Sequence, residues 1–302
     1  MANPDIIMPA KSADALPAVR TISLSDLQEC LRRGIDDFRA MPTHVVFLAL
    51  IYPIVGLLLV GATFERGLIP YAYPLAAGFA LIGPVAALWM YELSRRRELG
   101  LDTSWRHAFD VFHSPSLPAI VGLAALLLIT FAIWMACAES IYTAHFGYRR
   151  ESSIYEFMRL VLTTPEGRSM IVVGNAVGLL FAIVVGTISV ISFPLLLDRN
   201  AGFAGAILTS MKVVIRNPVV MAAWGLIVAV SLAAGMALFL VGLAVVMPVL
   251  GHATWHLYRK AVEPAPGERP EYQPRPKGKR YAADFPVSLF VASNDEEGGR
   301  NR

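Results

Sequence analysis

The chain has 302 residues, of which 56% are hydrophobic and 16% are charged, and its formal net charge is +3. Together with a mean hydropathy of +0.55, this composition excludes an ordinary soluble domain. It indicates an integral membrane protein, which has the lipid bilayer as a partner. The small net charge gives no reason to expect binding to nucleic acid.

The N-terminal part of the chain precedes any apolar run. Residues 1–22 are expected to form a disordered tail. Apolar residues then recur at three- and four-residue steps, which predicts an amphipathic helix at the membrane surface. They are Leu24, Leu27, Leu31, Ile35 and Phe38. Ser25 and Gln28 have the spacing of a capping box at its start.

Long segments without Asp, Glu, Lys or Arg follow, and each is long enough to cross a hydrocarbon layer of about 30 Å. The expected membrane domain covers residues 23–260, with spans near 45–64, 68–91, 116–138, 170–197, 218–235 and 239–258. The last two spans come from one apolar run, which is about twice too long for a single crossing. A turn is therefore expected at Ala233–Gly242. Residues 261–302 are rich in proline and polar residues, which predicts a disordered tail.

The first amphipathic helix has two counterparts further along the chain. One precedes the third span, with an N-cap at Asp102 or Thr103, and the other precedes the fifth span. Their apolar residues are Trp105, Ala108, Phe109 and Phe112, and Phe203, Ile207, Met211 and Ile215. Each of the three helices ends at a proline: Pro42, Pro115 and Pro218. The sequence thus predicts an all-α, polytopic membrane protein with six transmembrane helices as three hairpins, each preceded by an amphipathic interfacial helix. Internal duplication and simple alternation of apolar spans with basic loops both account for this pattern.

Arg and Lys concentrate in alternate connections, and this asymmetry predicts the orientation. The segments before the first span, between spans two and three, between spans four and five, and after the last span are all basic. By the positive-inside rule, both termini are cytoplasmic and the number of spans is even. We expect a multi-pass protein of the bacterial inner membrane.

His252 and His256 lie four residues apart, a spacing that places two imidazoles on one helix face, where both can bind one metal ion or haem. Two ligands leave such a site incomplete, and Ala253 stands where a zinc protease has its glutamate. Asp198 lies four residues after Pro194, as His252 does after Pro248. Glu92 lies eight residues after Pro84, as His256 does after Pro248. A polar cluster of Glu92, Asp198, His252 and His256 is therefore one hypothesis. Helix pairing at the membrane rim and a proton-linked role are the alternatives.

Gly174 and Gly178 form a GxxxG spacing around Asn175, inside the fourth span. Small residues allow helices to approach closely, and a buried amide can hydrogen-bond across the contact. We expect these residues to serve helix packing. No nucleotide-binding glycine loop, GxSxG motif or paired catalytic carboxylate appears, so an enzymatic role has no specific support and no cofactor is predicted.

Three strings resemble an uncharacterised proteobacterial family of integral membrane proteins, the domain of unknown function DUF2189. They are "ISFPLLLDR" at 191–199, "RNPVVMAAWG" at 216–225 and "MPVLGHATWHLYRK" at 247–260. Some relatives are labelled as cytochrome c oxidase proteins, so the resemblance implies a respiratory setting. The chain departs from a haem-bearing oxidase subunit, because only two of its six histidines fall within an expected span.

The leading hypothesis is a non-catalytic accessory or assembly partner of a membrane complex, with a respiratory complex as one candidate. The first alternative is a carrier or permease for a lipid or a small apolar solute. The second is a haem-binding or metal-binding membrane protein that uses His252 and His256. The sequence leaves the oligomeric state open.

Overall fold

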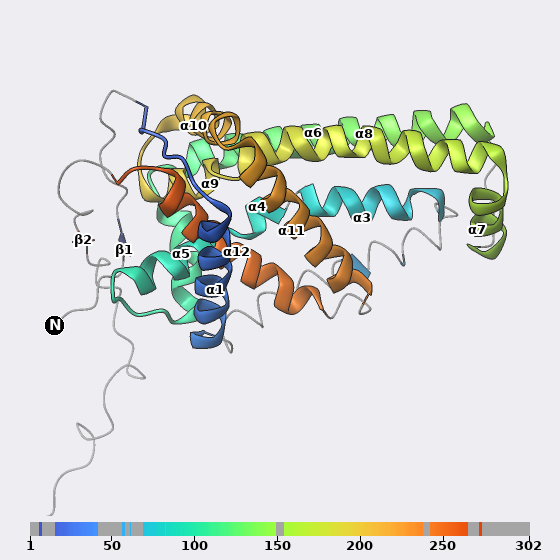
Figure 1. Cartoon of the computed structure of the whole chain (residues 1–302). Helices are drawn as coiled ribbons and strands as arrows, with labels where there is room; N and C mark the ends of the chain where they lie inside the picture. Colours follow the sequence, from blue (N-terminus) through green and yellow to red (C-terminus); the bar gives the residue numbers. More distant parts are fainter. Residues whose placement is uncertain are drawn as a thin grey trace, which may run out of the picture.

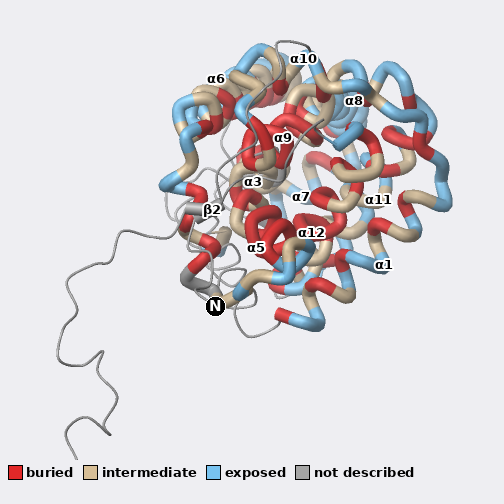
Figure 2. The backbone as a smooth tube through the Cα atoms, turned by 90° about the vertical axis from the view of Figure 1, so that its left-hand side faces the viewer, coloured by how far each residue is buried: buried red, intermediate tan, exposed pale blue. Residues whose placement is uncertain are grey.

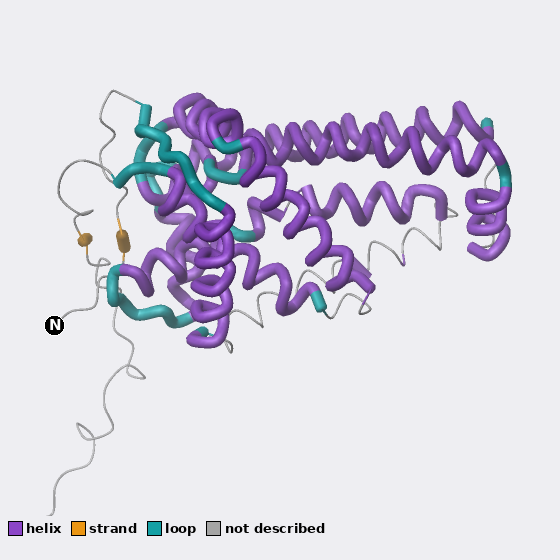
Figure 3. Tube along the Cα trace, viewed as in Figure 1, coloured by secondary structure: helices purple, strands orange, loops and turns teal. Residues whose placement is uncertain are grey.

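The computed structural model describes residues 6–7, 16–41, 56–57, 61, 69–81, 83–148, 154–237, 242–264 and 272–273. The expected first span, 45–64, lies almost wholly outside the described residues, as does most of both tails. Nearly all of the described chain is helical (Figure 3). The α-helices are α1 (Leu24–Ala40), α3 (Ala72–Leu81), α4 (Gly83–Ala86), α5 (Leu88–Glu98), α6 (Leu117–Phe146), α7 (Ile154–Thr163), α8 (Pro165–Ser189), α9 (Ser192–Asp198), α10 (Gly202–Arg216), α11 (Pro218–Ala237) and α12 (Leu243–Ala261). Two 3₁₀ helices, η1 (Ile69–Tyr71) and η2 (Trp105–His113), and an antiparallel pair of two-residue strands, β1 (Ile6–Ile7) and β2 (Tyr272–Gln273), complete it.

Three described helical stretches are long and apolar enough to cross a membrane: Leu117–Phe146, Pro165–Asp198 and Pro218–Ala237. The first two form the long hairpin of α6 and α8, with α3 beside it and α7 at its far end (Figure 1). Much of their surface is apolar and faces outward, as expected for helices whose solvent is lipid. The chain therefore has helices suited to an integral membrane protein.

Prolines interrupt two of the expected spans. α8 and α9 are separated at Val190 and Ile191, and Pro194, which has no N–H, cannot donate to the carbonyl four residues before it. The expected span 68–91 is likewise divided among η1, α3, α4 and α5. Pro248, by contrast, lies within an unbroken α12.

The end of the molecule opposite α7 is a compact bundle. Its centre is formed by α5, α9 and α12, which are mostly buried (Figure 2). The helices that precede the expected hairpins surround this centre: η2 packs on α5, α10 packs on α9, and α1 packs on α12. Each therefore contacts the second helix of the preceding unit, and α1 closes the ring by contacting the last.

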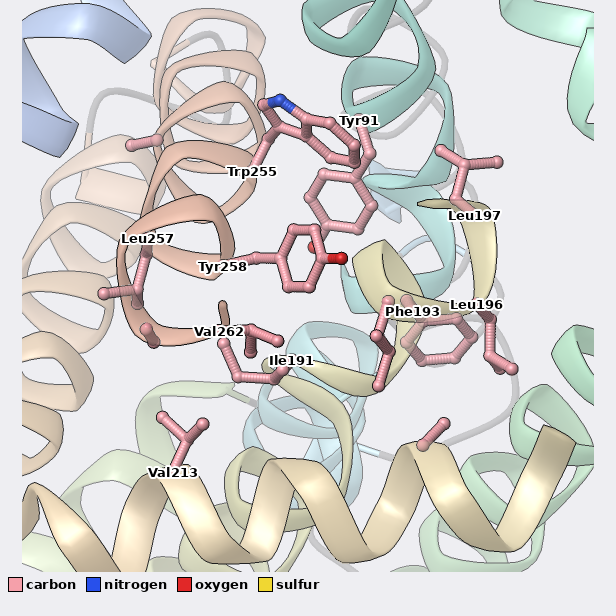
Figure 4. Close-up of a cluster of buried hydrophobic side chains, with 14 of the residues drawn as sticks. Tyr91, Ile191, Phe193, Leu196, Leu197, Val213, Trp255, Leu257, Tyr258 and Val262 are labelled. Carbon is pink, nitrogen blue, oxygen red and sulfur yellow. The ribbon is translucent and has the colours of Figure 1, made fainter. Parts of the chain in front are cut away.

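Aromatic and aliphatic side chains fill the space between the three central helices. Tyr91 of α5, Phe193 of α9, and Trp255 and Tyr258 of α12 converge there (Figure 4). The rings of Trp255 and Tyr258 lie 5.5 Å apart at 53°. Aromatic side chains bury large apolar areas, so this cluster contributes to the stability of the bundle.

The flanks of the helical region are hydrogen-bonded to each other. Arg20 N–H donates to the Ala261 carbonyl at 2.8 Å, and Glu263 N–H donates to the Ala18 carbonyl at 3.0 Å. The side chain of Asn217 fixes the same strand-like segment, because it accepts from Ile22 N–H at 2.9 Å and donates to the Arg20 carbonyl at 3.0 Å. Residues 16–22, assigned by sequence to a tail, thus belong to the folded part of the chain.

The expected caps of two surface helices were wrong in detail. The capping box of α1 consists of Ser23 and Asp26, not Ser25 and Gln28, since the side chain of Ser23 accepts from the Asp26 N–H and the Asp26 carboxylate accepts from the Ser23 N–H. The N-cap of η2 is Ser104, and Asp102 instead accepts from the Ser104 N–H. Both errors arise because several adjacent polar residues satisfy the same spacing rule.

The buried face of α1 also differs from its apolar stripe. Leu27, Cys30, Gly34 and Asp37 are buried, whereas Leu24 and Ile35 are 54% and 37% exposed. Gly34 lies so close to α12 that a Cβ there would come 2.7 Å from the Ala253 backbone nitrogen. The face with the small residue therefore packs on α12, and part of the apolar stripe stays outside the bundle.

Candidate functional site

Asp37 is the point where the two histidines of α12 meet other helices. His256 Nε2 lies 2.9 Å from Asp37 Oδ2, and His252 Nδ1 lies 2.7 Å from Ser94 Oγ. Ser94 donates to the same Asp37 oxygen at 2.5 Å, and Arg97 forms an ion pair with the other oxygen. Asp37 is 4% exposed and His252 is fully buried. One carboxylate therefore connects α1, α5 and α12.

The surroundings of Asp37 favour its ionised form. Burial by itself raises the pKa of this carboxyl, but hydrogen bonds from His256 and Ser94, together with the charges of the two histidines, outweigh burial and lower the pKa below 3.8. Asp37 is thus a buried anion that is held by its partners.

Glu92 belongs to a second network, between α5 and η2. Its nearest cation is Arg95, at 3.4 Å, with Arg96 at 4.0 Å. Arg96, which is fully buried, reaches Asp110 at 3.4 Å and donates to the Asp102 carbonyl at 2.6 Å. His107 joins two acidic residues, Asp110 of η2 at 2.7 Å and Asp102, which precedes η2, at 3.2 Å. This network fastens η2 to α5.

Asp198 lies in a third network, between α9 and α12. It accepts from Tyr258 Oη at 2.5 Å and lies 3.5 Å from Arg259 Nη1. Arg259 also pairs with Glu98 at 2.8 Å, and Glu98 accepts from Trp255 Nε1 at 3.1 Å. These contacts join the ends of α5, α9 and α12.

The four residues of the expected polar cluster all lie at this end of the molecule, in three separate networks. His256 contacts Asp37 and His252 contacts Ser94, so both histidines belong to the Asp37 network. Glu92 pairs with Arg95, and Asp198 accepts from Tyr258. The aromatic side chains of Figure 4 lie between α5, α9 and α12, and two of them, Tyr258 and Trp255, donate hydrogen bonds to Asp198 and Glu98 of these networks. A role of these residues in binding stays a prediction.

Sequence reasoning missed the residues that complete the site: Asp37, Ser94, Arg97 and Glu98. A local signal existed for Asp37, which lies three residues after Gly34 and seven after Cys30, on one helix face. An acidic residue in line with small, buried positions indicates a polar contact across a helix interface. Ser94, Arg97 and Glu98 gave no such signal, because they lie in a polar run.

The geometry offers little to a metal ion. Within the ranges that the structure describes, no group of three or more His, Cys, Asp or Glu side chains is arranged to hold one. His256 is occupied through Nε2 by Asp37, and His252 through Nδ1 by Ser94.

An open pocket of about 230 Å³ lies beside these networks. It is formed by α1, α5 and α12, and its lining residues are Arg33, Asp37, Ser94, Arg97, Glu98, His256 and Arg259. The pocket therefore borders both the Asp37 and the Glu98 contacts.

The GxxxG segment lies on α8, where α3 and α6 approach it. Asn175 Oδ1 accepts from Tyr73 Oη of α3 at 2.8 Å, and Asn175 Nδ2 donates to the Ile171 carbonyl at 2.7 Å. A Cβ at Gly178 would lie 3.2 Å from the Trp134 ring of α6, while one at Gly174 would meet open space. Asn175 and Gly178 thus lie at helix contacts, and Gly174 does not.

Comparison with known protein families gives a match to part of the chain. The family described as "Predicted integral membrane protein (DUF2189)" matches residues 72–198, from α3 to the end of α9. Neither a curated protein nor a solved structure matches the chain. The expected resemblance is confirmed over this segment, which includes nearly all of the string at 191–199. Residues 72–198 are thus similar to the DUF2189 family of predicted integral membrane proteins, whose function is unknown.

Proposed function

We propose that the chain is a non-catalytic accessory protein of the bacterial inner membrane that associates with another membrane complex through the α6–α8 hairpin. The outward apolar surface of this hairpin carries the proposal. Leu128 and Ile133 on α6 are 57% and 52% exposed, and Val172 and Leu180 on α8 are 69% and 63% exposed. The hairpin extends well beyond the bundle (Figure 1), so it offers helix surface that no other described element covers.

The polar networks support a structural role for the other end. Asp37, Glu98 and Asp198 each join side chains of different helices, and their partners are Arg, His, Ser, Tyr and Trp donors. Asp37 is buried and Glu98 is 38% exposed, and each of the three carboxylates connects neighbouring helices through its partners. This favours a rigid helical bundle over a catalytic centre.

For the membrane topology we propose six spans in three hairpins, with both termini in the cytoplasm. The hydrogen bonds between residues 18–20 and 261–263 support an even number of crossings, because segments on opposite sides of a bilayer cannot pair. The basic segments around α1, η2, α10 and the end of α12 all lie at this one end, while α7 lies at the other (Figure 1). The positive-inside rule assigns the basic end to the cytoplasm.

Site-specific photocrosslinking tests the accessory role. A photoreactive amino acid replaces Val172 or Leu180 on α8, with Leu226 on α11, 65% exposed, as a control of matched exposure on another helix. We expect the α8 positions, and not Leu226, to give one discrete protein adduct in membranes. Adducts with lipid alone, or the same adducts from all three positions, would contradict the proposal.

A further inference from the structure

The pocket beside Asp37 brings together guanidinium groups from three helices. Arg33 comes from α1, Arg97 from α5 and Arg259 from α12. Their side chains are 50%, 41% and 32% exposed, so all three are accessible from solvent. Its volume of about 230 Å³ exceeds that of several water molecules at about 30 Å³ each. A pocket of this volume has room for a small charged group.

Arg33 and Arg97 keep donors beyond their ion pairs. Arg33 contacts Glu29 through Nη2, at 2.5 Å, and Arg97 contacts Asp37 through Nη1. A guanidinium carries five N–H donors in a planar fork, so a single pair does not exhaust it. This fork matches the oxygens of a phosphate group better than an ammonium does.

Each carboxylate that lines the pocket is engaged by several donors, among them Arg97 and Arg259 of the same lining. Asp37 is buried and accepts from Ser94, His256 and Arg97, while Glu98 accepts from Arg259 and Trp255. Glu29, the ion-pair partner of Arg33, is absent from the lining, so the lining itself carries three arginines and two carboxylates. We propose that the pocket binds a phosphate group, with Arg33 and Arg97 as its principal donors.

The position of Arg33 on α1 favours a soluble phosphate compound over a lipid headgroup as the source. Arg33 and the exposed Ile35 are two residues apart, which separates them by about 160° around the helix. If Ile35 and Leu24 face the membrane surface, as the proposed interfacial position of α1 requires, Arg33 faces the cytoplasm. This part of the inference rests on the proposed topology, whereas the phosphate chemistry does not.

Binding of inorganic pyrophosphate to the full chain, in nanodiscs of uncharged phosphatidylcholine, tests the proposal. A calorimetric titration with pyrophosphate is compared with a titration with sodium chloride at the same ionic strength. Both salts screen exposed charges, so a difference between the two titrations reports binding. Arg33→Gln removes a donor from the pocket, and Arg32→Gln is the matched control, because Arg32 is 70% exposed and is absent from the lining. The melting temperature of each unliganded variant reports whether the fold is retained.

We expect saturable binding that Arg33→Gln weakens by about tenfold and Arg32→Gln leaves unchanged. A second arm uses nanodiscs that contain phosphatidylglycerol. If phosphatidylglycerol binds in a way that depends on Arg33 and pyrophosphate does not bind, the pocket is a phosphate site for a lipid headgroup. That result would overturn the proposal that a soluble phosphate compound is the ligand. Absence of both kinds of binding, or an equal effect of the two variants, would overturn the site itself.

Discussion

His256 Nε2 lies 2.9 Å from Asp37 Oδ2, although the two residues are 219 positions apart in the chain. The contact joins the first described long helix to the last. It is reinforced by Ser94 of α5, so it ties three helices together at a buried carboxylate. The integrity of this end of the protein is therefore expected to depend on Asp37.

Replacing Asp37 by Asn should destabilise the protein by about 2–3 kcal/mol, because charge-assisted hydrogen bonds to a buried group are lost. Asp36 provides the control: its side chain is 46% exposed and pairs with Arg32 at 3.8 Å within the same helix. Asp36→Asn should cost less than about 1 kcal/mol. Thermal unfolding in detergent measures both, and equal losses would argue against the Asp37 network.

The same carboxylate predicts a pH dependence. Because the pKa of Asp37 is lower in the folded protein than the ordinary 3.8, its contribution is present above that pH and is lost as the pH falls through the folded pKa. The stability difference between the wild type and Asp37→Asn should therefore shrink in acid. Unfolding measured between about pH 6 and about pH 3 follows this difference, and a constant gap would contradict the assignment.

Gly34 tests the close approach of α1 to α12. A methyl group there would come within 2.8 Å of backbone atoms of Val249 and Ala253, so the helices must move apart. We expect Gly34→Ala to cost about 1–3 kcal/mol. Gly225 of α11 has no atom within 4 Å of a built Cβ, so Gly225→Ala should be neutral or slightly stabilising. Melting temperatures that rank the two variants in the opposite order would refute this packing.

The bond between Tyr73 and Asn175 predicts energetic coupling between α3 and α8. A double-mutant cycle with Tyr73→Phe and Asn175→Ala removes the contribution of the separate Asn175 bond to Ile171. Interhelical hydrogen bonds in membranes contribute about 0.6 kcal/mol on average, and a coupling of this size is expected. Additive effects of the two substitutions would mean that the bond contributes nothing.

Much of the helical content follows from composition and periodicity. An apolar run as long as Leu117–Phe146 is expected to cross a bilayer as a helix. The recurrence of apolar residues at three- and four-residue steps from Leu24 to Phe38 predicted α1. Resemblance to the family was also visible from the string at 191–199.

The partners of the candidate site residues could not be found in this way. Periodicity places His252 and His256 on one face of a helix, but it does not say which of several neighbours that face meets. The hypothesis of one polar cluster rested on related positions of Glu92, Asp198, His252 and His256 near the ends of three helices, and such positions do not determine which neighbour each side chain meets. The rings of Tyr91, Phe193 and Tyr258 pack between the three central helices, and Tyr258 also donates a hydrogen bond to Asp198.

The most direct test of the proposed topology is to determine on which side of the membrane residues 20 and 263 lie. Arg20 and Glu263 form an exposed ion pair at 3.8 Å, with exposed fractions of 48% and 52%, and Tyr148, 88% exposed, lies near the far end of α6. Single cysteines at these three positions, in a chain without Cys30 and Cys137, are labelled with a membrane-impermeant maleimide in intact spheroplasts and in inverted vesicles. The account predicts that residues 20 and 263 react only in inverted vesicles and residue 148 only in spheroplasts. Labelling of residues 20 and 263 from opposite sides would contradict it.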